Sequence, residues 1–253
     1  PDPGRSTVDT GAGPPPAGLA FALPQGRWTL LATVLGSGIA FLDSTVVTVA
    51  LPRIGADLDA GVSGLQWVLN GYLAALSALI LLGGSLGDRF GRRRVFVPGV
   101  VLFPAASVAC ALAPTIPVLV VGRAAQGVGG ALLTPGSLAI LEASFRPDDR
   151  ARAIGAWSGL TGIAAALGPF LGGWLVDAAS WRWIFLINVP ISALVVTVTV
   201  RHVPESLDPG AAGRLDVPGA LLAAVALGAL CWGMIAAGDR GWAAPAVLGS
   251  LAV

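Results

Sequence analysis

Long apolar runs separated by short polar segments make up most of the chain. Each run has roughly 20 residues, the length that a helix needs to cross the hydrocarbon core of a bilayer. The runs occupy residues 28–50, 66–86, 95–113, 117–141, 153–175, 183–200 and 217–237. Another run begins near residue 243. The pattern predicts an all-α integral membrane protein.

The polar segments predict the division into domains. Residues 1–26 are rich in proline, glycine and alanine, a composition typical of a disordered terminus. Residues 27–200 hold the first six runs and predict a six-helix bundle, followed by a polar loop over 201–216. Residues 217–253 predict linker helices, of which the last is truncated. Because the chain starts without methionine and ends within an apolar run, we expect it to be a piece of a longer protein.

Composition supports a membrane environment and excludes several classes of function. Hydrophobic residues make up 55% of the chain and charged residues 11%, whereas soluble domains carry about 25% charged residues. A net charge of +1 gives no strong attraction to nucleic acid. Cys110 and Cys231 lie in apolar runs and His202 stands alone in a polar segment. We therefore expect no metal, no cofactor and no enzymatic site.

The distribution of arginine predicts the orientation, because cytoplasmic loops carry an excess of positive residues. With a cytoplasmic N-terminus, the outer segments hold only Arg53, Arg182 and Arg240. The inner segments then hold Arg5, Arg27, Arg89, Arg92, Arg93, Arg94, Arg146, Arg150, Arg152, Arg201 and Arg214. This asymmetry predicts a multi-pass protein of the cell inner (plasma) membrane with its N-terminus inside.

Two charged residues lie deep within predicted spans. Asp43 is roughly 12 Å from the outer end of the first span, and Arg123 is roughly 9 Å from the outer end of the fourth. Pairing would lower the cost of burying both charges, so we expect a direct or near ion pair. The alternative is that each residue meets backbone carbonyls or water separately. Asn70, Tyr72 and Gln126 are further polar residues expected to line a cavity.

Alternating charges gather at the predicted inner face, between the second and third spans and at the inner end of the fourth. They could form a conformational latch between helices, or simply a solvated positive loop. The candidate latch residues are Gly84, Asp88, Arg89, Gly91, Arg92, Arg93 and Glu142.

The fifth predicted span contains small residues at helical spacing, among them Gly155, Gly168, Gly172 and Gly173. Such a face lets another helix approach closely. Pro169 removes a backbone donor and favours a bend. Close packing is the simpler interpretation, and a hinge is the other.

Several of these strings resemble signatures of the major facilitator superfamily. The segment Gly84-Ser-Leu-Gly-Asp88-Arg-Phe-Gly91-Arg92-Arg-Arg resembles its motif A, and Arg123-x-x-Gln126-Gly127 resembles its motif B. Gly155 with Gly168-Pro169-x-x-Gly172-Gly173 resembles motif C of the drug/proton antiporters. Ala164 stands where that motif has glycine, and is still small.

Two other strings resemble the 14-span drug-efflux subfamily, the QacA/EmrB-like permeases. They are Leu42-Asp43-Ser-Thr45-Val-Val-Thr-Val-Ala50-Leu-Pro52 and Trp181-Arg-Trp-Ile-Phe-Leu-Ile-Asn-Val-Pro190. The resemblance implies the N-terminal six-helix bundle of this fold plus one to two linker helices, without the C-terminal bundle that transport needs. It implies export of hydrophobic or cationic drugs coupled to proton influx, with Asp43 and Arg123 as the coupling pair. A same-fold exporter of one metabolite or self-made antibiotic, and a non-transporting membrane scaffold, are the alternatives.

The predicted orientation can be tested with single cysteines at Ser6 and Thr115, in a background without Cys110 and Cys231. An impermeant thiol reagent applied to intact cells should label the Thr115 position only, because the arginine asymmetry places the N-terminus inside. Labelling at the Ser6 position in intact cells would show that the orientation is wrong.

Overall fold

The computed structural model describes residues 18–207 and 217–252. It confirms an all-α membrane fold, and the described part contains seven spans long and apolar enough to cross a membrane. The helices are α1 (Pro24–Asp57), α2 (Val62–Phe90), α3 (Arg92–Ala111), α4 (Ile116–Ser144), α5 (Pro147–Ala178), α6 (Trp183–Leu186), α7 (Asn188–His202), α8 (Val217–Arg240) and α9 (Pro245–Leu251). Helices α6 and α7 together form the sixth span.

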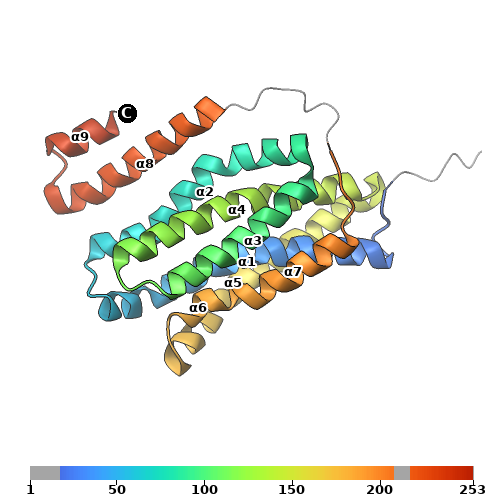
Figure 1. Cartoon of the computed structure of the whole chain (residues 1–253), viewed down its shortest axis with the longest axis horizontal. Helices are drawn as coiled ribbons and strands as arrows, with labels where there is room; N and C mark the ends of the chain where they lie inside the picture. The colour runs from blue at the N-terminus through green and yellow to red at the C-terminus, as the bar shows by residue number, and fades with distance from the viewer. Residues whose placement is uncertain (1–17, 208–216, 253) are drawn as a thin grey trace, which may run out of the picture.

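Helix α4 is central to the bundle (Figure 1) and packs against both α2 and α3. Helix α1 packs along α5, and α7 lies against α1 and α3. Helix α8 lies beside α2 at the edge of the bundle, and α9 folds back onto α8. The first six spans therefore form one bundle with the seventh on its flank.

Prolines set several helix boundaries. Pro24, Pro117 and Pro147 occupy the first or second position of α1, α4 and α5, where a missing N–H costs nothing because it would have no helical partner. Prolines further inside are tolerated, and α5 continues through Pro169 without a break, because neighbouring helices can compensate for the lost hydrogen bond.

The sixth span differs from the single helix predicted over 183–200. Its helical pattern is interrupted at Ile187, between α6 and α7. Pro190 explains the interruption, because it cannot donate to the carbonyl of Leu186 and its ring crowds that group. The backbone of Ile187 keeps φ −60° and ψ −27°, so the span continues in the same direction.

The N-terminal segment corrects the prediction of disorder for part of 1–26. Residues 1–17 lie outside the described part, and residues 18–23 have defined contacts with the bundle. Leu19 forms a parallel bridge with Phe145, and its N–H donates to the carbonyl of Ser144 at 2.7 Å. The N–H of Phe21 donates to Asp149 Oδ2 at 3.0 Å. Composition missed this order because the partners belong to the distant α4–α5 connection.

Helices α2 and α4 come so close that their backbones nearly touch. A Cβ at Gly83 would collide with the carbonyl oxygen of Ala131, and one at Gly127 would lie 2.5 Å from the carbonyl oxygen of Tyr72. Glycine at both positions therefore permits the approach, as expected for helices packed in lipid.

We predict that Gly83→Ala destabilises the intact protein by about 1–3 kcal/mol, the usual cost of overpacking a close contact. The thermal unfolding midpoint of the purified protein measures the effect. Gly84→Ala is the matched control, because a Cβ there would meet only Pro135 Cβ at an ordinary 3.7 Å. Equal midpoints for the two variants would contradict the close approach.

Candidate functional site: a buried ion pair and an arginine-rich end

Asp43 lies in the middle of α1 and is completely buried. Its Oδ2 accepts a hydrogen bond from Arg123 Nη1 of α4 at 2.5 Å. Its Oδ1 accepts from Gln126 Nε2 of α4 at 3.2 Å and from Asn188 Nδ2 of α7 at 3.1 Å. Three donors on two other helices thus surround one carboxylate, and the expected contact between Asp43 and Arg123 is present.

Arg123 is equally buried, with 1% of its surface exposed. Its Nε donates to the backbone carbonyl of Val68 at 3.1 Å, and Nη1 also donates to Gln126 Oε1 at 2.8 Å. The Tyr72 ring lies under the guanidinium, with 4.3 Å from Arg123 Cζ to the ring centre. The cation is therefore stabilised by a carboxylate, two oxygen acceptors and an aromatic face.

Ser107 of α3 holds the two amides that approach Asp43. Its hydroxyl oxygen accepts from Gln126 Nε2 at 2.7 Å and from Asn188 Nδ2 at 3.2 Å. Its own O–H donates to the carbonyl of Phe103 at 2.9 Å. We call Asp43, Arg123, Gln126, Asn188 and Ser107 the polar network.

The polar network lies between two apolar clusters of the core. One cluster contains Phe96, Phe103 and Ile140, and the other contains Ile54, Leu119 and Trp181. Helices α1, α3 and α4 each pass from the first cluster through the network to the second, and the sixth span does so through α7 and α6 together. The charges therefore sit in a low-dielectric environment, where a paired charge interacts strongly and an unpaired one is very costly.

Gln126 and Asn70 were also predicted to line a cavity. Gln126 is fully buried in the polar network. Asn70 is half-buried and makes no hydrogen bond to a described residue. Ser107 and Asn188 were not predicted as site residues. The available signal for Asn188 was an amide within an otherwise apolar run, in a string already matched to the drug-efflux subfamily.

Tyr72, the third residue of this group, lines a hollow. The hollow has a volume of about 180 Å³ and lies between α1, α2 and α4. Its other lining residues are Ala40, Phe41, Ser44, Leu73, Leu76 and Thr134. The hydroxyl of Thr134 is buried without a hydrogen-bond partner among the described residues. Because Arg123 stacks on the Tyr72 ring, this one side chain connects the hollow to the polar network.

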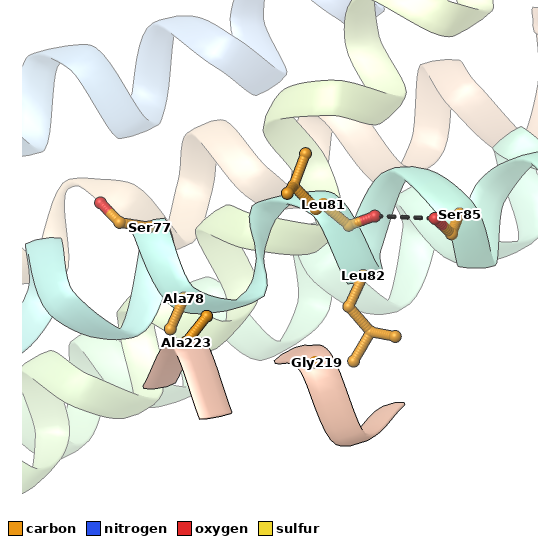
Figure 2. A pocket seen from close by; sticks show the side chains of 7 residues that line it. All are labelled: Ser77, Ala78, Leu81, Leu82, Ser85, Gly219 and Ala223. Carbon is orange, nitrogen blue, oxygen red and sulfur yellow. Dashed lines mark hydrogen bonds between the residues drawn. The ribbon is translucent and has the colours of Figure 1, made fainter. Parts of the chain in front are cut away.

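A second hollow, of about 280 Å³, lies between α2 and α8 (Figure 2). Its lining is uncharged: Ser77, Ala78, Leu81, Leu82, Ser85, Gly219 and Ala223. The Ser85 hydroxyl already donates to the carbonyl of Leu81 at 3.0 Å. Neither Tyr72 nor any polar-network residue lines it, so no described contact connects it to the buried charges.

The candidate latch residues gather where α2 ends and α3 begins, which we call the arginine-rich end. Asp88 Oδ1 accepts from Arg92 Nε at 2.9 Å and pairs with Arg92 Nη2 at 2.9 Å. Arg92 Nη1 also donates to the carbonyl of Ala139 on α4 at 3.2 Å. Arg92 thus ties the α2–α3 connection to α4.

Glu205, which follows α7, is the acidic partner that sequence reasoning missed. Its Oε1 accepts from the backbone N–H of Arg93 at 3.0 Å, and its Oε2 lies 3.7 Å from Nε of both Arg93 and Arg94. Gly91 has φ +109°, and a Cβ there would lie 2.8 Å from Glu205 Oε1. The carboxylate therefore sits at the positive N-terminus of α3, where an anion is favoured.

The remaining candidate latch residues are placed differently. Glu142 is exposed at the end of α4 and pairs with no described residue. The guanidinium of Arg89 lies 5.6 Å from the centre of the Phe90 ring. Gly84 faces Pro135 of α4.

The predicted hinge residues of α5 divide between two faces. Gly168 packs against Thr45 of α1, and a Cβ at Gly172 would lie 3.0 Å from Val46 Cγ1 of the same helix. Open space surrounds Gly155 and Gly173, and Pro169 is exposed. One face of α5 is thus used inside the bundle, while the other is free among the described residues.

Comparison with known proteins identifies the family. The family model described as Major Facilitator Superfamily matches residues 33–252. The chain belongs to the major facilitator superfamily. It therefore belongs to a family of membrane transporters and is a multi-pass membrane protein, as the motifs implied.

Two curated relatives are named for resistance, and one of them also for export. The chain is 44% identical over 215 residues to "Multidrug resistance protein Stp" of Mycobacterium tuberculosis (strain CDC 1551 / Oshkosh), covering 85% of this chain and 40% of that protein. It is 39% identical to the "Tetracenomycin C resistance and export protein" of Streptomyces glaucescens, covering 94% of this chain and 45% of that protein. The chain spans less than half the length of these two relatives.

Solved structures confirm the fold. A crystal structure of the peptide transporter POT in complex with sulfate superposes with a TM-score of 0.65 at 21% identity, covering 93% of this chain and 51% of that one. A bacterial homologue of the human lysosomal transporter Spinster, inward-facing and occupied, gives 0.63 at 21% identity, covering 91% and 58%. At this identity the likeness concerns the fold alone.

We predict that Glu205→Gln loosens the N-terminus of α3 in the intact protein. Loss of an anion that binds a helix N-terminus and two arginines should cost about 1–2 kcal/mol, which raises the population of the locally open state by about 5- to 30-fold. Hydrogen exchange in a peptide covering 91–97 measures the change. Glu142→Gln is the matched control and should exchange at the wild-type rate; an equal acceleration in both variants would contradict the role of Glu205.

Proposed function

We propose that the protein containing this chain exports hydrophobic or cationic drugs or antibiotics across the cell membrane in exchange for protons. The observation that carries this proposal is the buried Asp43–Arg123 pair behind a hollow lined by Tyr72. A charged pair inside a membrane protein is costly and typically functional. The relatives' names supply the class of cargo.

Proton binding to Asp43 is the step that this chain can perform. A proton that enters from outside neutralises the carboxylate and removes the charge that attracts Arg123. The guanidinium keeps its bond to the Val68 carbonyl, its contact with Gln126 and its stacking on Tyr72. The Tyr72 ring contacts Arg123 and also lines the hollow. The change of charge at Asp43 is therefore transmitted to the hollow through Arg123 and this ring. A cationic cargo would compete with the proton for the same carboxylate.

The hollow between α1, α2 and α4 would form one wall of the cargo site. In this fold the cargo binds near the midplane between two halves of the transporter. The open glycine face of α5, at Gly155 and Gly173, would meet the other half. Alternating access would then rock one half against the other around the bound cargo.

The arginine-rich end would lie in the cytoplasm, as the arginine asymmetry predicts. The Asp88–Arg92 pair and its bond to Ala139 would stabilise one of the two conformations without touching cargo. Making and breaking ion pairs of this kind is a common way to bias a two-state element.

A transporter of one antibiotic is the second candidate, because one relative is named for resistance to and export of tetracenomycin C. Competition between chemically unrelated cationic dyes separates the two. Mutual inhibition of their efflux supports a multidrug exporter, whereas transport of neither dye supports a narrow cargo.

We predict that Asp43→Asn in the intact protein reduces proton-driven efflux of ethidium to the background rate while the protein still reaches the membrane. Asparagine cannot carry the proton but keeps the shape of the side chain. Efflux from cells, and proton release from acid-loaded everted vesicles when dye is added to the medium, measure the two halves of the exchange. Asp177→Asn is the matched control, since Asp177 is exposed in the last turn of α5. Wild-type coupling in Asp43→Asn would show that another residue carries the proton.

A further inference from the structure

We propose that Asn188 is a positioning residue that transmits the charge state of Asp43 to the interrupted sixth span. The idea rests on the proposed proton coupling at Asp43 and adds a step to it. The proposal is based on the side-chain amide of Asn188, at the start of α7. Its nitrogen is hydrogen-bonded, whereas its oxygen has no partner among the described residues.

The amide of Asn188 is only half satisfied in this structure. Nδ2 donates to Asp43 Oδ1 at 3.1 Å and to Ser107 Oγ at 3.2 Å. Oδ1 is buried and has no hydrogen-bond partner among the described residues. A buried carbonyl oxygen without a partner costs free energy and is uncommon in native structures.

The unpaired oxygen becomes useful when Asp43 is protonated. A protonated carboxyl has an O–H that needs an acceptor, and the Arg123 guanidinium has none to offer. The amide oxygen of Gln126 already accepts from Arg123 Nη1 at 2.8 Å and from Cys110 Sγ at 3.3 Å. A half turn of the Asn188 amide would bring its free oxygen to Asp43 with almost no change in shape. In one orientation the Asn188 amide would donate a hydrogen bond to the ionised Asp43 carboxylate. In the other it would accept one from the protonated carboxyl group.

Both sides of the interruption contact the ion pair. Asn188 is the first residue of α7, directly after Ile187, and bonds to Asp43. Phe185 of α6 has its ring centre 6.0 Å from Arg123 Cζ. Pro190 leaves the carbonyl of Leu186 without a helical donor, so this turn is weakly held. A change at Asp43 therefore acts on the turn in which the Leu186 carbonyl lacks this donor.

The other charged and titratable groups around Asp43 are few. Tyr72 faces it from α2, Cys110 from α3 and Arg123 from α4. The charged side chains of α5 and α7 lie at the ends of those helices. Asn188 is thus the contact through which α7 responds to the charge of Asp43.

The test uses the purified intact protein in lipid nanodiscs over a pH series. Infrared difference spectra follow protonation of Asp43, through a carboxyl band that is absent in Asp43→Asn. Hydrogen exchange in a peptide covering residues 181–192 follows the interruption, with labelling times scaled for the intrinsic effect of pH. We expect protection of this peptide in the wild type to change about fivefold as the Asp43 band titrates.

Asn188→Leu and Asn188→Ala should abolish this pH response while the Asp43 band still titrates. The alanine variant is included because alanine is smaller than asparagine and adds no volume to the core. Ser192→Ala is the matched control: Ser192 is buried on the same helix one turn further along, its hydroxyl is also unpaired among the described residues, and it does not touch Asp43. It should keep the wild-type response.

The outcomes separate this inference from the proposed function. Absence of an Asp43-dependent band overturns proton binding at Asp43 and, with it, the inference. A titrating band with a wild-type exchange response in both Asn188 variants overturns the inference alone. Equal loss of the response in Ser192→Ala also overturns it, because packing of α7 would then explain the effect.

Discussion

Burial of the Asp43 charge is the constraint on which the arrangement of the bundle depends. A lone carboxylate at this depth would be prohibitively costly, so donors on other helices must converge on it. Arg123 and Gln126 bring α4 to α1, and Asn188 brings α7. Losing one partner of a buried pair typically costs about 3–5 kcal/mol, more than the intact pair contributes. The network therefore specifies how the helices meet more than it stabilises them, and the apolar clusters on either side supply the burial.

The arginine-rich end solves a different electrostatic problem, in contact with solvent. Consecutive arginines at the N-terminus of α3 repel each other and the positive end of the helix dipole. Glu205 offsets this charge from the chain that follows α7, while Asp88 engages Arg92 within the α2–α3 connection. Gly91 allows the carboxylate to approach the backbone. The charges of the string Gly84–Arg94 are thus balanced in part by Glu205, which lies more than a hundred positions further along the chain and outside the string.

Hydrophobic patterning by itself determined the class of protein and most of the spans, and it placed the two charges inside spans. The requirement for about 20 apolar residues per span is local in sequence and can be read without a fold. The contact between Asp43 and Arg123 was also predictable, because a charge deep in lipid has few possible partners. Composition failed for the end of the N-terminal segment, where the Leu19 N–H bonds to Ser144.

Only the tertiary structure decided which uncharged polar groups join the charges. A serine or amide within an apolar helix can bond to its own backbone or to a neighbour, and sequence does not say which. Ser107 does both, whereas Asn188 reaches across to Asp43 because the sixth span meets α1 and α3 at that turn. Gln126, which was expected at a cavity, is fully buried in the polar network for the same reason. Which face of a helix meets a buried charge is set by how several helices pack together, and that information is spread over the whole chain.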